Sequence, residues 1–409
     1  MTDTKMKSVP KVRFEGFTDD WEQRKFFGVI QKTIDFRGRT PRKMNAAWTT
    51  SGHLALSALN VKNGYIDYSS DPHYGDDALY HRWMDGNELC KDDVLFTMEA
   101  PAGNVALVPD DQEYILSQRT VAFRTNKQFM TQQFLAVLMS TPEFQASIKS
   151  LSTGGTAQGI SQKSLRFLTI KYPSNLAEQD RISGLVINLN GAIALHQRKH
   201  DSLLKLKQAY LQKMFPKNGQ KTPELRFGGF TDDWEQRKLT EIVNRVNKSS
   251  NSDVLPKVEF EDIVSGEGRL NKDISSKLDS RKGTLFESEN ILYGKLRPYL
   301  KNWLFPDFEG VALGDFWVFE ATDVSVPSFD YYLIQSDDYQ KVANDTSGTK
   351  MPRSDWKNVS STDFAIPSKD EQKQIGAFFK QLDDTITLHQ QQLDNLKQLK
   401  KWALQNLFV

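Results

Sequence analysis

The sequence has almost no cysteine and no long apolar run. Cys90 is the one cysteine in 409 residues, which excludes an internal disulfide framework and favours a reducing compartment. No run of about 18 apolar residues occurs, and residues 1–11 lack the apolar centre of a signal peptide. We therefore expect a cytoplasmic protein of two or three domains. The net charge of +1 neither requires nor excludes a nucleic-acid partner.

Motifs of catalytic sites are missing as well. The sequence has no Walker-type phosphate loop, no Gly-x-Gly-x-x-Gly, no His-Glu-x-x-His, no paired cysteines and no Gly-x-Ser-x-Gly. The Asn/Asp-Pro-Pro-aromatic motif of amino-methyltransferases is also absent. Residues 367–373 superficially resemble part of a metal nuclease triad, but Glu371 has an explanation at a helix start. We expect no catalytic residue, metal or cofactor in this chain.

What the sequence does have is a long stretch that occurs twice. Residues 178–215 return as residues 371–408 at an offset of 193, with identities that include Glu178/Glu371, Gln179/Gln372 and Phe215/Phe408. Neither copy contains proline, and each exceeds the usual length of a globular helix. We predict one helix per copy, about 50–57 Å long at about 1.5 Å per residue.

Apolar residues recur at heptad spacing in both copies, which favours pairing of the two helices. The predicted pairing interface consists of Ile182, Leu189, Ile193, His196 and Leu203, with Ile375, Leu382, Ile386, His389 and Leu396. His200, Lys207 and Lys400 fall on the same seam, which predicts a stripe that drifts around the helix. His196 and His389 occupy equivalent positions, where packed histidines are favoured over a metal site.

A second repeat precedes each helix. Residues 10–25 return as residues 223–238, and both copies contain Gly-Phe-Thr-Asp-Asp-Trp-Glu-Gln-Arg-Lys. We call each copy the opener. A repeat period near 200 residues indicates domain duplication. The predicted divisions are a first domain 10–177, a helix 178–215, a linker 216–222, a second domain 223–370 and a helix 371–409.

Both domains are predicted to mix strands and helices, giving an α/β (α+β mixed) fold class. The predicted strands are Val94–Met98, Thr120–Arg124, Ile291–Lys295, Phe316–Glu320 and Phe364–Pro367. Residues 134–145 and 329–340 are each predicted to form a helix and a turn. At the start of the long helices, Asn175 and Ser368 are predicted N-caps, with Glu178 and Glu371 completing capping boxes.

Basic residues cluster in predicted loops and are candidate DNA contacts, because guanidinium groups pair with phosphate and guanine in a bidentate manner. Polar residues of a Gly-Thr loop at residues 153–159 are added to them. The candidates are Arg37, Arg39, Arg42, Lys43, Thr156, Gln158 and Lys163 in the first domain, and Lys295, Arg297, Lys350, Arg353 and Lys357 in the second. Composition alone leaves a solvated basic surface as the alternative.

The opener, the Ile-Pro-Ser-x-x-Glu-Gln entry to the second long helix and the duplicated plan resemble the specificity subunit of type I restriction-modification systems. The resemblance covers essentially the whole chain. It implies two target recognition domains that read double-stranded DNA, two long helices paired antiparallel, and no catalytic activity. It also implies two methyltransferase subunits as partners, joined by two restriction subunits in the full complex. S-adenosylmethionine, ATP and Mg²⁺ are expected in those partners.

Antiparallel helices that each carry a domain at the N-terminal end are expected to place the domains at opposite ends. Such a chain would read two different half-sites about 34–36 Å apart, with helix length setting the gap. The alternative is a tandem coiled-coil scaffold that binds only proteins, which would show no salt-sensitive DNA binding.

Overall fold

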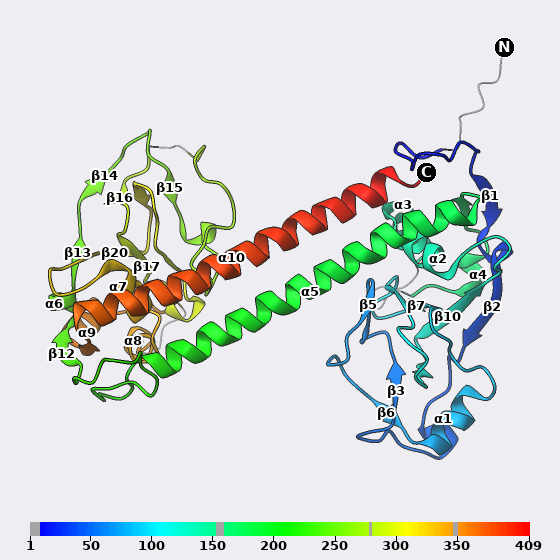
Figure 1. Ribbon diagram of the computed structural model, residues 1–409, viewed down its shortest axis with the longest axis horizontal. Coiled ribbons are helices and arrows are strands. Elements are labelled where there is room, and N and C mark those ends of the chain that lie inside the picture. The colour runs from blue at the N-terminus through cyan, green and yellow to red at the C-terminus, as the bar shows by residue number, and fades with distance from the viewer. Residues whose placement is uncertain (1–8, 153–158, 278–279, 347–350) are drawn as a thin grey trace, which may run out of the picture. The chain divides into compact units, whose positions relative to one another are not determined.

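The computed structural model describes residues 9–152, 159–277, 280–346 and 351–409, and it divides into two units. Unit 1 consists of residues 1–196 and 392–409, and unit 2 of residues 197–391. Each unit contains a mixed α/β body and parts of both long helices, α5 (Leu176–Met214) and α10 (Lys369–Asn406) (Figure 1). The boundary between the two units therefore falls within each long helix, whereas the sequence predicted each helix as a division of its own.

The body of unit 1 is built around a four-stranded antiparallel sheet ordered β2-β10-β7-β8. Its strands are β2 (Ile30–Asp35), β7 (Val94–Thr97), β8 (Val105–Leu107) and β10 (Thr120–Thr125). A three-stranded sheet contains β3 (His53–Leu56), β6 (Tyr74–Gly75) and β9 (Ile115–Leu116), and a two-stranded one contains β4 (Val61–Lys62) and β5 (Tyr65–Ile66). The strands β1 (Glu22–Lys25) and β11 (Thr169–Tyr172) pair with each other. The helices are α1 (Asp77–Met84), α2 (Gln132–Met139), α3 (Pro142–Leu151) and α4 (Gln162–Leu165).

The body of unit 2 repeats this plan with an antiparallel sheet ordered β13-β20-β17-β18. Its strands are β13 (Val243–Val246), β17 (Ile291–Gly294), β18 (Trp303–Leu304) and β20 (Phe316–Ala321). A second sheet contains β14 (Ser249–Ser250), β15 (Lys257–Val258), β16 (Gly283–Phe286) and β19 (Gly310–Ala312), while β12 (Glu235–Lys238) pairs with β21 (Asp363–Ile366). The helices are α6 (Leu239–Ile242), α7 (Pro327–Leu333), α8 (Asp337–Ala343) and α9 (Trp356–Ser361).

The shared framework follows from the repeated sequence, and the second sheets carry the divergence. The pair β1–β11 joins Lys25 to Thr169, and β12–β21 joins Lys238 to Asp363 in the same way. By contrast, the second sheet has three strands in unit 1 and four in unit 2. The predicted strands are confirmed. Each predicted helix and turn proves to be two helices, because capping residues such as Thr141, followed by Pro142, start a new one.

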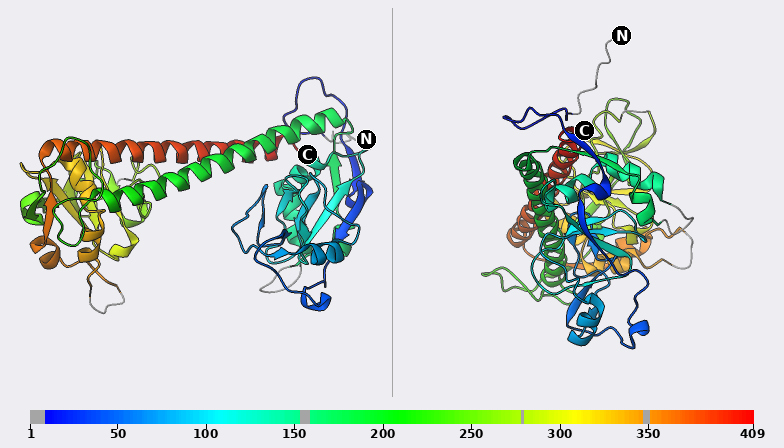
Figure 2. Two further views of the ribbon diagram at one scale, coloured as in Figure 1. Left: turned by 60° about the horizontal axis from the view of Figure 1, so that its bottom comes forward. Right: turned by 90° about the vertical axis from the view of Figure 1, so that its right-hand side faces the viewer.

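Within each unit the two long helices run antiparallel, and side chains of both helices are part of the hydrophobic core (Figures 1 and 2). In unit 1 the core joins Ile182 of α5 to Leu404 of α10, and the ring of Phe408 stacks on Phe134 with centroids 5.6 Å apart. In unit 2 Phe215, the counterpart of Phe408, stacks on Phe329 at 5.5 Å. The predicted antiparallel pairing is therefore confirmed inside each unit.

Burial along the predicted pairing interface varies. Ile182, Leu189, Ile375 and Ile386 are buried, whereas Ile193, His196, Leu203, Leu382, His389 and Leu396 are half-buried. Along the stretches where the predicted residues are half-buried, other residues at heptad spacing are buried, such as His200, Lys207 and Leu393. The buried stripe therefore drifts around each helix, as predicted. Lys207 stays on the seam because its ammonium lies 2.7 Å from the Asp383 carboxylate, which also accepts the Tyr332 hydroxyl at 2.9 Å.

Candidate nucleic-acid interface

An arginine from each opener anchors the start of each long helix. The guanidinium of Arg13 donates to both carboxylate oxygens of the fully buried Glu178, at 2.7 and 2.8 Å. Arg226 binds the equally buried Glu371 at 2.7 Å twice. These hydrogen bonds raise the pKa of both arginines. The anchors fix the first residues of the helices against the bodies that carry the basic loops.

The predicted capping boxes are wrong in the role given to these glutamates. Asn175 does cap α5, since its side chain accepts the Ala177 N–H at 2.9 Å. The carboxylates of Glu178 and Glu371 instead bind arginines far away in the sequence. A buried carboxylate gains more from a bidentate guanidinium than from one backbone N–H. Sequence spacing could not show that preference, because the partner lies 165 residues away.

The candidate contacts Arg37, Arg39, Arg42 and Lys43 lie in one segment of unit 1, residues 36–43, which we call the arginine loop. Some of these side chains bind other parts of the protein, and others are exposed. Arg37 forms an ion pair with Asp35 at 2.6 Å. The Arg39 guanidinium lies 4.3 Å from the centre of the Phe36 ring and donates to a backbone carbonyl. Arg42 and Lys43 are exposed, and the Lys43 ammonium also donates to the Gly38 carbonyl at 2.8 Å. Arg42 therefore faces outward, whereas Lys43 is exposed but also helps to shape the loop.

The loop also forms one wall of a cavity of about 310 Å³. Arg39 and Arg119 line it, together with the rings of Trp48, His73 and Trp83. The Trp48 ring contacts both other rings, with centroids 5.7 Å from His73 and 5.6 Å from Trp83. Positive charge and aromatic surface thus meet in one concave site.

The helix α4 lies beside the arginine loop. Its Gln162 donates to the Asp35 carboxylate at 2.6 Å, so the structure brings the predicted contacts Arg37 and Lys163 into one region. Lys163 is exposed. Sequence reasoning missed Arg166 and Phe167, both exposed at the end of this helix. A signal was present, since residues 144–177 contain no Asp or Glu.

In unit 2 the structure places two predicted contacts beside one acid and joins a third to the same pair of loops. Arg353 binds the Asp315 carboxylate at 2.9 Å, and the Lys295 ammonium lies 3.9 Å from it. The Arg297 N–H donates to the Pro352 carbonyl at 2.7 Å, which joins the two loops. Lys357 is exposed on α9 and is the positional counterpart of Lys163. The remaining predicted contacts, Thr156, Gln158 and Lys350, lie outside the described residues.

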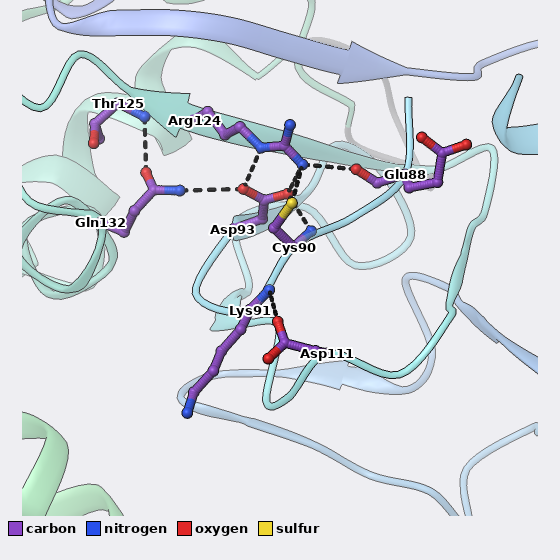
Figure 3. Close-up of polar contacts among 8 residues, drawn as sticks. All are labelled: Glu88, Cys90, Lys91, Asp93, Asp111, Arg124, Thr125 and Gln132. Atoms are coloured by element: carbon purple, nitrogen blue, oxygen red, sulfur yellow. Dashed lines mark hydrogen bonds and ion pairs between the residues drawn. The ribbon is translucent and has the colours of Figure 1, made fainter. Parts of the chain in front are cut away.

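Not every cation near these loops is available for a ligand. Figure 3 shows Arg124 of β10, whose guanidinium binds the buried Asp93 carboxylate at 2.7 and 2.8 Å. It also donates to the Glu88 carbonyl at 2.6 Å and to the Cys90 sulfur at 3.1 Å. The hydrogen bonds to Asp93 raise the pKa of Arg124. This side chain fixes the segment before β7 to the main sheet.

The comparison with family models decides the identity. The model described as the type I restriction modification DNA specificity domain matches residues 84–205 and 231–398, one match for each half of the duplicated plan. The chain belongs to this family. Its members confer DNA specificity, and their established role is non-catalytic.

One curated protein and one solved structure are similar to this chain. The specificity subunit of the type I restriction enzyme HindI from Haemophilus influenzae is 27% identical over 191 residues. That alignment covers 43% of this chain and 41% of the relative, so it spans less than half of either protein. The crystal structure of a type I restriction-modification S subunit from M. genitalium superposes with a TM-score of 0.67 at 15% identity, covering 98% of this chain and 99% of that one. The latter shows a shared fold.

Among the described residues, no helix is long and apolar enough to cross a membrane. In the same part of the chain, no group of three or more His, Cys, Asp or Glu side chains is placed to hold a metal ion.

Proposed function

We propose that this chain is the subunit that gives a type I restriction-modification complex its DNA sequence specificity, with each unit reading one half of a bipartite, asymmetric site. The observation that carries the proposal is the combination of a repeated framework with divergent second sheets and loops. A shared framework holds both reading surfaces in the same way, while different loops read different bases.

The exposed cations of each unit supply the DNA contacts in this proposal. Among the predicted contacts, the exposed cations are Arg42, Lys43 and Lys163 in unit 1, and Arg353 and Lys357 in unit 2. Arg353 is paired with Asp315, but more than half of its side chain is exposed, so phosphate can compete for it. Arg37, Arg39, Lys295 and Arg297 act by shaping the loops, and Thr156, Gln158 and Lys350 complete the proposed set.

The chemistry of the complex belongs to its partners. We assign S-adenosylmethionine to methyltransferase subunits, and ATP and Mg²⁺ to restriction subunits, with DNA in the cytoplasm as the shared substrate. Two methyltransferase copies are proposed because the long helices expose leucines at equivalent positions, Leu195/Leu388 and Leu206/Leu399. Unit 1 holds Leu195 and Leu399, and unit 2 holds Leu388 and Leu206, so each unit offers the same pair. A repeated apolar surface suits two copies of one partner.

The test is to co-express the chain with the methyltransferase subunit of its own restriction-modification system and to map adenine methylation across a plasmid by single-molecule sequencing. A split, asymmetric motif with a fixed gap is the expected result. A stable complex that leaves every adenine unmodified would count against two functional reading surfaces. Salt titration of DNA binding by that complex then tests the scaffold alternative, which predicts no salt-dependent binding.

A further inference from the structure

Phe167 is an aromatic side chain held out into solvent on an ordered piece of backbone. Its exposed fraction is 74%, although the neighbouring Leu165 is fully buried. The Phe167 N–H donates to the Ser164 carbonyl at 3.1 Å, and the next residue's N–H donates to the Leu165 carbonyl at 3.2 Å. The ring therefore stands on a hydrogen-bonded turn anchored in the core.

Three cations belong to this turn or contact its backbone. Lys163 and Arg166 are exposed in the same turn, and the ammonium of Lys25 donates to the Phe167 carbonyl at 3.3 Å. Asp35, which contacts the helix α4, forms an ion pair with Arg37 and accepts a hydrogen bond from Gln162. With no acid in residues 144–177, the surface around the ring suits a polyanion.

The shared framework does not require an aromatic residue at this position. Thr169 and Asp363 pair with equivalent lysines of the openers, so counting back two residues makes Ser361 the counterpart of Phe167. Ser361 uses its hydroxyl to bind the Lys357 carbonyl at 2.7 Å. The acids Asp355 and Asp363 flank it, unlike the acid-free segment of unit 1. The exposed ring is thus particular to one unit.

We propose that Phe167 is a wedge that stacks into a base step of the half-site read by unit 1, while Lys25, Lys163 and Arg166 hold the adjoining phosphates. Proteins that kink DNA insert apolar side chains between base pairs in this way, and an aromatic ring recovers stacking energy from the opened step. The proposal rests on the DNA-specificity function proposed above. It deepens that function by making unit 1 sensitive to how easily its half-site unstacks.

The test uses the complex with its methyltransferase and a duplex carrying 2-aminopurine at successive positions of the unit 1 half-site. Wild-type complex is expected to raise the fluorescence at one step. Phe167→Ser, which copies unit 2, should abolish that rise and weaken specific binding about tenfold or more. Phe167→Trp should retain both. Val254→Ser removes a side chain that is 75% exposed in unit 2 and serves as the matched control.

The outcomes separate this inference from the proposed function. If wild-type complex shows no specific DNA binding, the proposed function fails. If it binds and Phe167→Ser gives the same affinity and the same fluorescence rise, the wedge is overturned. Loss of methyltransferase association in Phe167→Ser would also overturn it, by making the ring a protein contact. Equal melting temperatures of the variants establish that the fold is intact.

Discussion

At the scale of single residues, the arginine anchors make a direct prediction. Replacing Arg226 by Ala strands the fully buried Glu371 carboxylate without its charged partner, and we expect a loss of about 3–5 kcal/mol in the stability of unit 2. Arg13→Ala should do the same to unit 1 through Glu178. Urea unfolding followed by tryptophan fluorescence measures both.

The matched control for Arg226→Ala is Arg237→Ala in the same unit. Its partner Glu235 lies 2.7 Å away, but the two side chains are 34% and 68% exposed. Water and salt screen such a pair, so the expected cost is below about 1 kcal/mol. Equal losses in the two variants would show that Arg226 has no special anchoring role.

A buried carboxyl in α7 predicts a pH dependence. Asp330 is fully buried and accepts the Ser325 hydroxyl at 2.7 Å, and burial raises its pKa well above the usual value. A raised folded-state pKa gives stability that is present below the unfolded-state pKa and is lost as pH rises through the folded-state pKa. Asp330→Asn should remove this loss. From pH 4 to pH 8, the free energy of unfolding of the variant should therefore rise relative to that of the wild type. The expected rise is about 1.4 kcal/mol for each pH unit that separates the folded-state pKa of Asp330 from its unfolded-state pKa.

Urea unfolding at pH 4, 6 and 8 measures the gain, and the exposed Asp323→Asn is the control, with no change in slope expected. Parallel stability curves for wild type and Asp330→Asn would mean that the carboxyl titrates alike in the folded and unfolded chain.

At the scale of elements, the polar contact on the helix seam is predicted to behave as a coupled pair. Lys207→Ala leaves the Asp383 carboxylate half-buried without its ammonium, and Asp383→Ala leaves the buried Lys207 alone. Each should cost about 3 kcal/mol, whereas Lys207→Met combined with Asp383→Leu should cost about 1 kcal/mol, mainly the lost acceptor of the Tyr332 hydroxyl. A double-mutant cycle completed by the single variants Lys207→Met and Asp383→Leu measures the coupling, and additive losses would refute it.

Most helices and strands of the shared framework were predictable, because each sequence pattern occurs twice in the chain. Long helices without proline and apolar strands such as Val94–Thr97 are fixed by local pattern. The second sheets were not predicted, since strands of two residues such as β14 and β15 carry almost no periodicity. The candidate DNA contacts stay a prediction. Charge marked Arg37 and Arg39 for DNA, and only the structure shows that Arg37 pairs with Asp35 and that the Arg39 guanidinium lies over the Phe36 ring.

At the scale of the whole molecule, the shared framework predicts that reading surfaces can be exchanged. The pairs β1–β11 and β12–β21 have the same register and frame each body. Residues 26–168 of unit 1 could therefore replace residues 239–362 of unit 2 without disturbing the strands that attach the body to its helix. Both bodies would then carry the same loops, and we expect methylation at a site whose two halves have the same bases.

Methylation mapping of the co-expressed complex reads this outcome directly, beside wild type as the reference. A chain with the reverse exchange, residues 239–362 in place of 26–168, is the matched control and should yield the other half-site twice. The two chimaeric motifs together must then account for both halves of the wild-type motif. If each chimaera assembles with its methyltransferase but leaves one half of its motif unlike the other, the bases are not read by the exchanged loops. Base recognition would then depend on the framework or the helices. The two duplicated bodies would not read their half-sites independently.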